Sequence, residues 1–196
     1  MIVLSAGHDP IYYGAINPRY HLIEHHCAAA ICDMVMDAYR GDPRVHLLDM
    51  ARHVPLFDRR LASLFAKVRH INDLHAIEPV DLAIELHFNA SVRHNAAGSE
   101  VLVYGNGDQV SEQGLRYAGI FRPLLEAFDH EIDDRGVKHF STLIFLRDTA
   151  PPAIILEPLF IDHDRDAEPL LTHEGRARIA GAIIDGIRAA LEEARA

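Results

Sequence analysis

The sequence predicts an α/β fold in which a largely parallel sheet is covered by helices on both faces. Short apolar runs alternate along the chain with helical segments of about ten to twenty residues, an order typical of this class. The apolar runs are continuous rather than alternating, as expected for strands that are buried on both faces. With 196 residues, 49% of them hydrophobic, the chain can bury one substantial core, and its length alone does not require a second domain.

The first half of the chain alternates strand and helix. The run IVLSAG at residues 2–7 predicts a buried strand, which opens into a polar loop that extends to about residue 20. Apolar residues then recur at helical spacing over residues 22–40, until the sequence GDP ends the pattern. The elements expected next are a short strand at 45–48, a helix at about 56–74 and the strand VDLAIELHF at 80–88.

The second half continues this alternation without an internal repeat or a linker. The elements expected there are a strand SEVLVYG at 99–105, an amphipathic helix at 112–128, one or two extended segments in RGVKHFSTLIFLR at 135–147, a buried strand in PPAIILEPLFI at 151–161, and a terminal helix at 174–194. In such sheets the ligand site gathers outside the carboxyl ends of the strands. The candidate residues are therefore sought at that edge.

The excess of acidic residues limits the kinds of molecule that the chain is expected to bind. Lysine and arginine number 19 against 29 for aspartate and glutamate, which gives a formal charge of -10. This excess of negative charge argues against nucleic acid and anionic lipid as partners, and a strongly anionic wall polymer would also repel the chain. The composition leaves the oligomeric state open.

Neither a membrane span nor an export signal is expected. No stretch of about eighteen uninterrupted apolar residues occurs, and the start of the chain lacks a basic region followed by an apolar run and a small-residue cleavage site. Cys27 and Cys32 lie in one predicted helix, where their angular offset puts them out of disulfide reach. We expect two core thiols, consistent with synthesis in a reducing cytoplasm.

Four polar residues stand where the predicted elements can bring them together. His8 follows the first strand, His87 lies at the end of the VDLAIEL strand, and Glu157 ends the AIIL run. Glu24 opens the first long helix, and the loop before it can fold the helix start back over the end of the first strand. Two imidazoles and one carboxylate with an open fourth position form the ligand set of a hydrolytic zinc site. The remaining carboxylate can take a proton from water and deliver it to a leaving amine, which indicates amide hydrolysis.

The order of these residues resembles the zinc amidase family that cleaves N-acetylmuramoyl-L-alanine bonds. The matching segments cover nearly the whole chain: IVLSAGH at 2–8, Glu24, ELHFNA at 85–90, Gly98 with SEVLVY, RGVK at 135–138 and PPAIILEPLFI at 151–161. The resemblance implies that His8, Glu24 and His87 are zinc ligands and that Glu157 is the catalytic glutamate. It also implies a three-layer, phosphorylase/hydrolase-like fold with a six-stranded, mostly parallel sheet, and one catalytic domain over residues 1–196 without a wall-binding module.

Some positions depart from the usual family pattern. Asp9 and Pro10 stand where a glycine-rich turn is usual, and Pro158 and Leu159 replace the small residues that usually follow the catalytic glutamate. We therefore expect a divergent member whose substrate contacts near Glu157 differ. The interval between the second histidine and this glutamate is accounted for by a strand, one helix and an extended segment, which predicts an unblocked site, as in phage lysins.

Two histidines compete with the proposed carboxylate ligand. His25 and His26 adjoin Glu24, and a helix turns by about 100° per residue. Only one of the three side chains can therefore face the site squarely, and the resemblance selects Glu24.

Three further side chains admit more than one role. Asn89 either orients a ligand or the substrate, or merely ends its strand. Lys138 could contact a peptide carboxylate or be a solvated surface charge. A purely structural role for Glu157 would require an arginine partner such as Arg147, because burying an unpaired carboxylate is costly.

The sequence thus predicts an enzyme that uses Zn2+ to hydrolyse the amide bond between N-acetylmuramic acid and L-alanine in peptidoglycan or muropeptides. Without a signal peptide, it would reach the cell wall only after release or export by other means. Two other functions stay open. One is a zinc amidohydrolase of small N-acyl amino acids, similar to N-formylglutamate amidohydrolase; the other is a wall-associated module that has kept the fold and lost the reaction.

Overall fold

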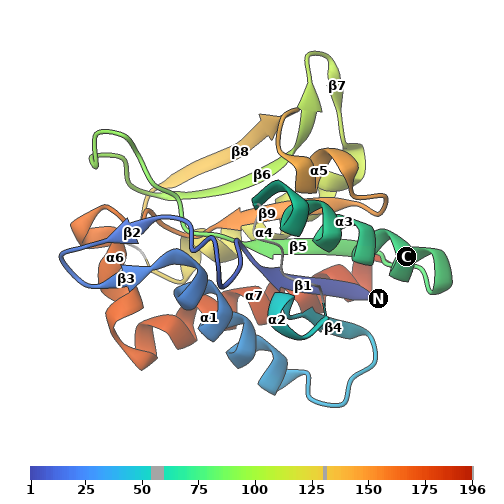
Figure 1. Ribbon diagram of the computed structural model, residues 1–196, viewed down its shortest axis with the longest axis horizontal. Coiled ribbons are helices and arrows are strands. Elements are labelled where there is room, and N and C mark those ends of the chain that lie inside the picture. Colours follow the sequence, from blue (N-terminus) through green and yellow to red (C-terminus); the bar gives the residue numbers. More distant parts are fainter. Residues whose placement is uncertain (54–59, 130–131, 196) are drawn as a thin grey trace.

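A seven-stranded sheet forms the centre of the computed structural model, which describes residues 1–53, 60–129 and 132–195 (Figure 1). The strand order is β4–β1–β5–β9–β6, and both β7 and β8 pair with β6. A separate two-stranded sheet precedes the first long helix. The strands are β1 Ile2–Ala6, β2 Ile16–Asn17, β3 Leu22–Ile23, β4 Val45–Leu48, β5 Leu82–Leu86, β6 Ser99–Asn106, β7 Gln109–Val110, β8 Asp134–Phe140 and β9 Ala153–Glu157.

The sheet is mixed, with parallel pairing predominant. Strands β4, β1, β5 and β9 are parallel to one another, and β8 is parallel to β6. Strand β6 joins the two groups antiparallel to β9. The predicted mostly parallel sheet is confirmed, although the count rises from six strands to seven. The addition is β7, a two-residue strand that returns antiparallel along the end of β6 after Gly107.

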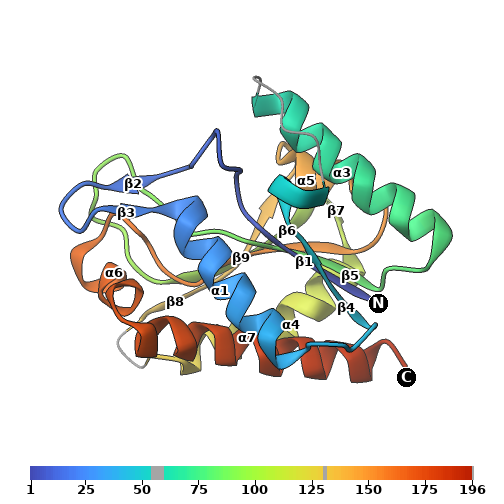
Figure 2. The same cartoon turned by 60° about the horizontal axis from the view of Figure 1, so that its bottom comes forward.

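Helices cover both faces of the sheet, which confirms the three-layer α/β architecture (Figure 2). One face carries α1 Glu24–Ala38, α4 Glu112–Ala127 and α7 His173–Glu193, and α6 Asp164–Leu171 packs beside α7. The other face carries α3 Arg60–Ile77 and α5 Ile144–Asp148, and the short α2 Met50–His53 contributes to the same core. Each face has its own cluster of buried apolar side chains.

Alternation along the strands decides on which face the polar site residues lie. On β5, Ile84 packs in the core beneath α1, α4 and α7, whereas Ala83 packs in the core beneath α3 and α5. Successive side chains of a strand point to opposite faces, so Glu85 shares the face of Ala83, and Glu157 shares the face of Ile155. These two carboxylates therefore lie on the side of the sheet that α3 and α5 cover.

The segment RGVKHFSTLIFLR differs from its prediction. Its first part is β8, as expected, but residues 144–148 form α5 rather than a second extended segment. The neighbouring Phe145 and Leu146 are both buried in the core beneath α3 and α5. A strand would have pointed these two side chains to opposite faces, whereas one turn of helix places both in the same core.

Two helices begin a few residues away from their predicted starts. Helix α1 begins at Glu24 rather than at residue 22, because Leu22 and Ile23 pair with β2. The start of the helix expected at 56–74 falls partly on residues 54–59, outside the described residues, and α3 begins at Arg60. Helices α2 and α6 and the short strands β2, β3 and β7 were not predicted, since each is too short to show a periodic pattern.

The structure bears on the state of the two cysteines and on membrane-spanning helices. Cys27 and Cys32 are both buried on α1 and both free, as predicted. Within the described residues, no helix has the length and apolar character needed to cross a bilayer.

Candidate metal centre

His8 enters the site from the loop that follows β1. Its backbone adopts a left-handed conformation with φ of 59°, which turns the chain sharply after the strand. The preceding Gly7 lies against the ring of His87, and a Cβ atom on Gly7 would come within 2.6 Å of three of the ring atoms. A glycine is therefore required between β1 and His8 for the two imidazoles to approach each other.

Glu24 is the first residue of α1 and is buried. One carboxylate oxygen, Oε1, lies 2.8 Å from His87 Nδ1 and accepts a hydrogen bond from the backbone N–H of Phe88. The other oxygen, Oε2, lies 3.0 Å from His8 Nε2 and accepts a hydrogen bond from the backbone N–H of Ala15. Burial alone would raise the pKa of Glu24, but the hydrogen bonds from His8 and His87 outweigh it and hold the pKa far below its usual range.

His87 follows β5 directly and lies between two carboxylates. Its Nδ1 faces Glu24, and its Nε2 lies 3.1 Å from Oε2 of Glu85. Burial lowers the pKa of His87, but the charge of Glu85 and the hydrogen bonds to Glu24 and Glu85 raise it to about 10 overall. The imidazole is thus held strongly from both sides.

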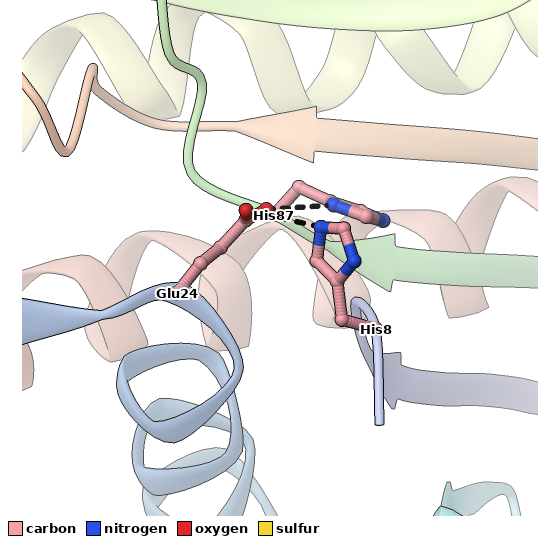
Figure 3. Close-up of side chains that lie close together, drawn as sticks. All are labelled: His8, Glu24 and His87. Carbon is pink, nitrogen blue, oxygen red and sulfur yellow. Dashed lines mark hydrogen bonds and ion pairs between the residues drawn. The ribbon is translucent and has the colours of Figure 1, made fainter. Parts of the chain in front are cut away.

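These three side chains converge on one point at the carboxyl edge of the sheet (Figure 3). One potential ligand atom from each of His8, Glu24 and His87 lies within 4.8 Å of the others. The two imidazole rings meet edge to face, with their centroids 4.8 Å apart. The structure thus brings together the three residues expected to hold a metal, and their donor set of two nitrogens and one carboxylate is one that zinc takes in hydrolytic sites.

The neighbouring histidines do not share this arrangement. His25 is buried, and its Nδ1 lies 2.9 Å from the carbonyl oxygen of Gly7, so it supports the backbone just before His8. His26 is exposed and contacts Tyr13 edge to face. The helix rotation leaves Glu24 as the member of the group that points toward the site.

Glu157 ends β9 on the same side of the sheet and is 8% exposed. Its Oε2 is buried and has no hydrogen-bond partner within the described part of the chain. Burial raises the pKa of Glu157 to about 8, against the opposing charge of His87 and with smaller contributions from neighbouring carboxylates. The arginine partner required for a purely structural role is not Arg147, which pairs with Asp148 instead.

A cavity of about 360 Å3 joins these groups. Its polar end holds the three candidate ligands together with Lys67, Glu85, Glu100 and Glu157. The rest of the wall is mostly apolar, and its described residues include Met50, Leu64, Leu102, Phe140, Leu143, Ile144, Phe145 and Ile155. A polar, carboxylate-rich end beside an apolar wall suits the hydrolysis of a bond in an organic substrate.

Asn89 and Lys138, the two remaining candidate residues, differ in whether they line the cavity. Asn89 lines the cavity, but its backbone pairs with Phe160 and its side-chain oxygen accepts a hydrogen bond from Ala90. Lys138 lies on β8 opposite Leu102 and is not among the described residues that line the cavity. A contact of either side chain with substrate stays a prediction.

Sequence reasoning gave no role to several charged residues of the cavity, among them Glu85 and Lys67. Glu85 lies two positions before His87, and side chains two apart on a strand share a face, so this spacing was a signal that could have found it. Lys67 comes from α3, and nothing in its local sequence shows that it is buried. Its position depends on how α3 packs over the ends of β1 and β5.

The fold and the site together define an α/β protein with a candidate divalent-metal centre at the carboxyl edge of its sheet. The chain belongs to the N-acetylmuramoyl-L-alanine amidase family, whose model matches residues 2–189. A comparison with curated proteins gave no match.

Solved structures of similar fold cover almost the whole chain. The CwlD amidase from Clostridioides difficile, solved in complex with the GerS lipoprotein, has a TM-score of 0.80 at 17% identity, with 97% of this chain and 98% of that chain covered. The catalytic domain of CwlV from Bacillus (Paenibacillus) polymyxa var. colistinus has a TM-score of 0.77 at 18% identity, with 97% of both chains covered. The catalytic domain of an endolysin targeting Clostridia difficile reaches 0.74 at 26% identity, with 96% of both covered. These low identities agree with the expectation of a divergent family member.

Proposed function

We propose that this chain is a zinc-dependent amidase that hydrolyses the amide bond between N-acetylmuramic acid and L-alanine in peptidoglycan. The observation that carries this proposal is the convergence of His8, Glu24 and His87 beside Glu157 in one cavity. Membership of the amidase family supports the bond that is cleaved, and the seven-stranded sheet with its two helical layers supports one catalytic domain. The substrate places the action of the protein at the cell wall.

The three candidate ligands fit a zinc ion by their chemistry and by the space around them. Two imidazoles and a carboxylate leave a fourth position open, as catalytic zinc sites require. Gly7 and Gly14 lack the Cβ atoms that would collide with the ligand side chains. When bound, zinc supplies a Lewis acid that polarises the scissile carbonyl and activates water for attack.

Glu157 is the residue best suited to move protons in this reaction. It lines the same cavity as the candidate ligands, and burial raises its pKa above the usual carboxyl range, which suits a group that both accepts and donates a proton. As a carboxylate, Glu157 accepts a proton from the attacking water; as a carboxylic acid, it donates that proton to the amino nitrogen of the departing L-alanine. Bond cleavage then leaves a muramic acid carboxylate and a free peptide amine.

The proposal is tested by incubating the zinc-loaded protein with purified sacculi and identifying the released fragments by mass spectrometry. Stem peptides that begin with L-alanine are the expected product, and a chelator should abolish their release. Glu157→Gln should retain zinc but lower turnover by about 10² to 10⁴-fold, the usual range for losing a general acid or base. Intact sacculi, or wild-type turnover by this variant, would contradict the proposal.

A second candidate function is the hydrolysis of small N-acyl amino acids. It is favoured by the apolar wall formed by Leu102, Phe140, Leu143 and Ile144, which could enclose a compact acyl group. Activity on a panel of free N-acyl amino acids without activity on sacculi would select this function. Stoichiometric zinc without hydrolysis of either class of substrate would indicate a wall-associated module that has lost the reaction.

A further inference from the structure

Lys67 and Glu85 form a buried ion pair directly behind the candidate metal centre. Lys67 lies on α3 with 1% of its surface exposed, and Glu85 lies on β5 with 3% exposed. Burying two charges is costly, and such a pair is weak evidence for added stability. Its position beside His87 points to a role in the site.

The pair contacts both strands that carry the histidine ligands. The Lys67 ammonium donates a hydrogen bond of 2.9 Å to the carbonyl oxygen of Ala6, two residues before His8, and pairs with one oxygen of Glu85. The other oxygen of Glu85 lies 3.1 Å from His87 Nε2. Because β1 and β5 are adjacent and parallel, a single lysine from α3 can hold the ends of both.

An imidazole coordinates a metal through one nitrogen, and the hydrogen bond made by the other nitrogen decides which one is free. In His87, Nε2 faces Glu85, whereas Nδ1 faces Glu24 and the side where His8 also points. A carboxylate that accepts the Nε2 proton therefore leaves the lone pair of Nδ1 for the metal. Carboxylates that orient metal-binding histidines in this way commonly affect metal affinity.

We propose that Lys67 and Glu85 are a positioning pair, which fixes the tautomer and ring orientation of His87 so that Nδ1 is presented to the metal. Glu85 accepts the hydrogen bond from His87, and Lys67 holds Glu85 in place while it ties α3 to the end of β1. This inference rests on the proposed function, since it assigns a role toward the metal that His8, Glu24 and His87 would hold. It gives a role to Lys67 and Glu85, which are not themselves among the candidate metal ligands.

The proposal can be tested without mutation by proton-detected ¹⁵N spectroscopy of the histidine side chains in the zinc-loaded protein. His87 should carry its proton on Nε2, with the exchange protection expected for a buried hydrogen bond. The assignment follows from comparison with a His87→Ala sample. A proton on Nδ1 of His87 would overturn the proposal.

Paired substitutions give a second readout, with cobalt as the metal probe. Lys67→Met with Glu85→Leu replaces the ion pair by apolar side chains of similar size, a change that buried pairs often tolerate. Cobalt affinity should fall by about 10- to 100-fold, with an altered visible spectrum, because His87 loses its orienting acceptor. Lys67→Met with Glu85→Gln keeps a neutral acceptor and should recover most of the affinity and the spectrum.

A control variant separates positioning from general destabilisation. Ile183→Ala opens a cavity in the core beneath α7, on the opposite face of the sheet, and should leave cobalt affinity and spectrum unchanged. Wild-type cobalt binding by the Lys67→Met, Glu85→Leu protein would overturn the positioning role while leaving the proposed function intact. A wild-type protein that binds neither cobalt nor zinc would overturn both.

Discussion

Gly7 and Gly14 show at the scale of single residues how tightly the candidate centre is built. Gly14 has a φ of 79°, and a Cβ atom there would lie 2.3 Å from Glu24 Oε2 and 2.5 Å from His8 Nε2. A Cβ atom on Gly7 would lie 2.6 Å from ring atoms of His87. The ligand side chains can meet only because two backbone segments pass beside them without side chains of their own.

Removing His87 should remove the metal. His87→Ala deletes one of three candidate ligands and leaves Glu24 without one of its two histidine partners. We expect the variant to lose zinc and activity together, measured as zinc per chain after dialysis and as peptide release from sacculi. His26→Ala is the matched control, since His26 is an exposed histidine on α1 outside the centre. Full zinc content in His87→Ala would remove His87 from the site.

Glu157 should make the stability of the metal-free protein depend on pH. Its pKa is about 8 in the folded chain and near 4.5 when the side chain is exposed. As the pH rises, the unfolded chain therefore loses this proton at a lower pH than the folded chain does. Below about pH 4.5 Glu157 is protonated in both the folded and the unfolded chain, so its raised pKa does not lower the free energy of unfolding. Between pH 4.5 and 8 each pH unit lowers the free energy of unfolding by up to about 1.4 kcal/mol, and above pH 8 the loss levels off.

Glu157→Gln should abolish this contribution, because the amide does not titrate. Urea unfolding of both metal-free proteins at several pH values measures the difference. The variant should match the wild type near pH 4.5 and exceed it increasingly toward pH 8. Stability curves that stay parallel over this range would show that the buried carboxyl does not carry the raised pKa.

The four proposed catalytic and ligand residues could be placed from sequence because each marks the end or start of a predicted element. His8 and His87 follow strands, Glu157 ends one, and the carboxyl ends of parallel strands share an edge. The spacing of Glu85 from His87 could have placed Glu85 on the same face, but Lys67 could not be placed from the sequence. A lysine on a helix is normally solvated, and only the packing of α3 on the sheet shows that Lys67 is buried.

At the scale of elements, α7 is the longest helix within the described residues and packs against both α1 and α4. Thr172 caps its start, with Oγ1 accepting a hydrogen bond of 3.0 Å from the backbone N–H of Gly175. Thr172→Ala should lower the free energy of unfolding by about 1 kcal/mol, measured by urea unfolding, without changing zinc content. Thr172→Ser keeps the oxygen and should behave like the wild type. Equal stability of all three proteins would mean that the cap contributes nothing.

Long elements were predicted well and short ones poorly, and the reason is physical. Helices α1, α4 and α7 each show several turns of apolar periodicity, and β1, β5 and β9 are short, mostly apolar runs. The segment that forms α5 holds a single helical turn, in which no period can be recognised. The antiparallel direction of β6 is likewise invisible locally, because it depends on which neighbour the strand finds in the sheet.

For the whole molecule, the net charge of -10 bears on how the protein meets a cell wall. Many walls carry anionic polymers, and repulsion between like charges slows association over distances set by the screening length. That length falls from about 30 Å at 0.01 M salt to about 8 Å at physiological ionic strength. The rate on anionic walls should therefore increase as salt is added over this range.

This salt dependence should belong to the wall polymer and not to the chemical step. We expect peptide release from sacculi that retain anionic polymer to accelerate between about 0.01 and 0.15 M salt. Release from sacculi stripped of that polymer should change much less, and cleavage of a small soluble muropeptide should change least, because a small substrate carries little charge to repel. If all three substrates responded equally to salt, the effect would arise within the site, and the net charge of the chain would play no part in its approach to the wall.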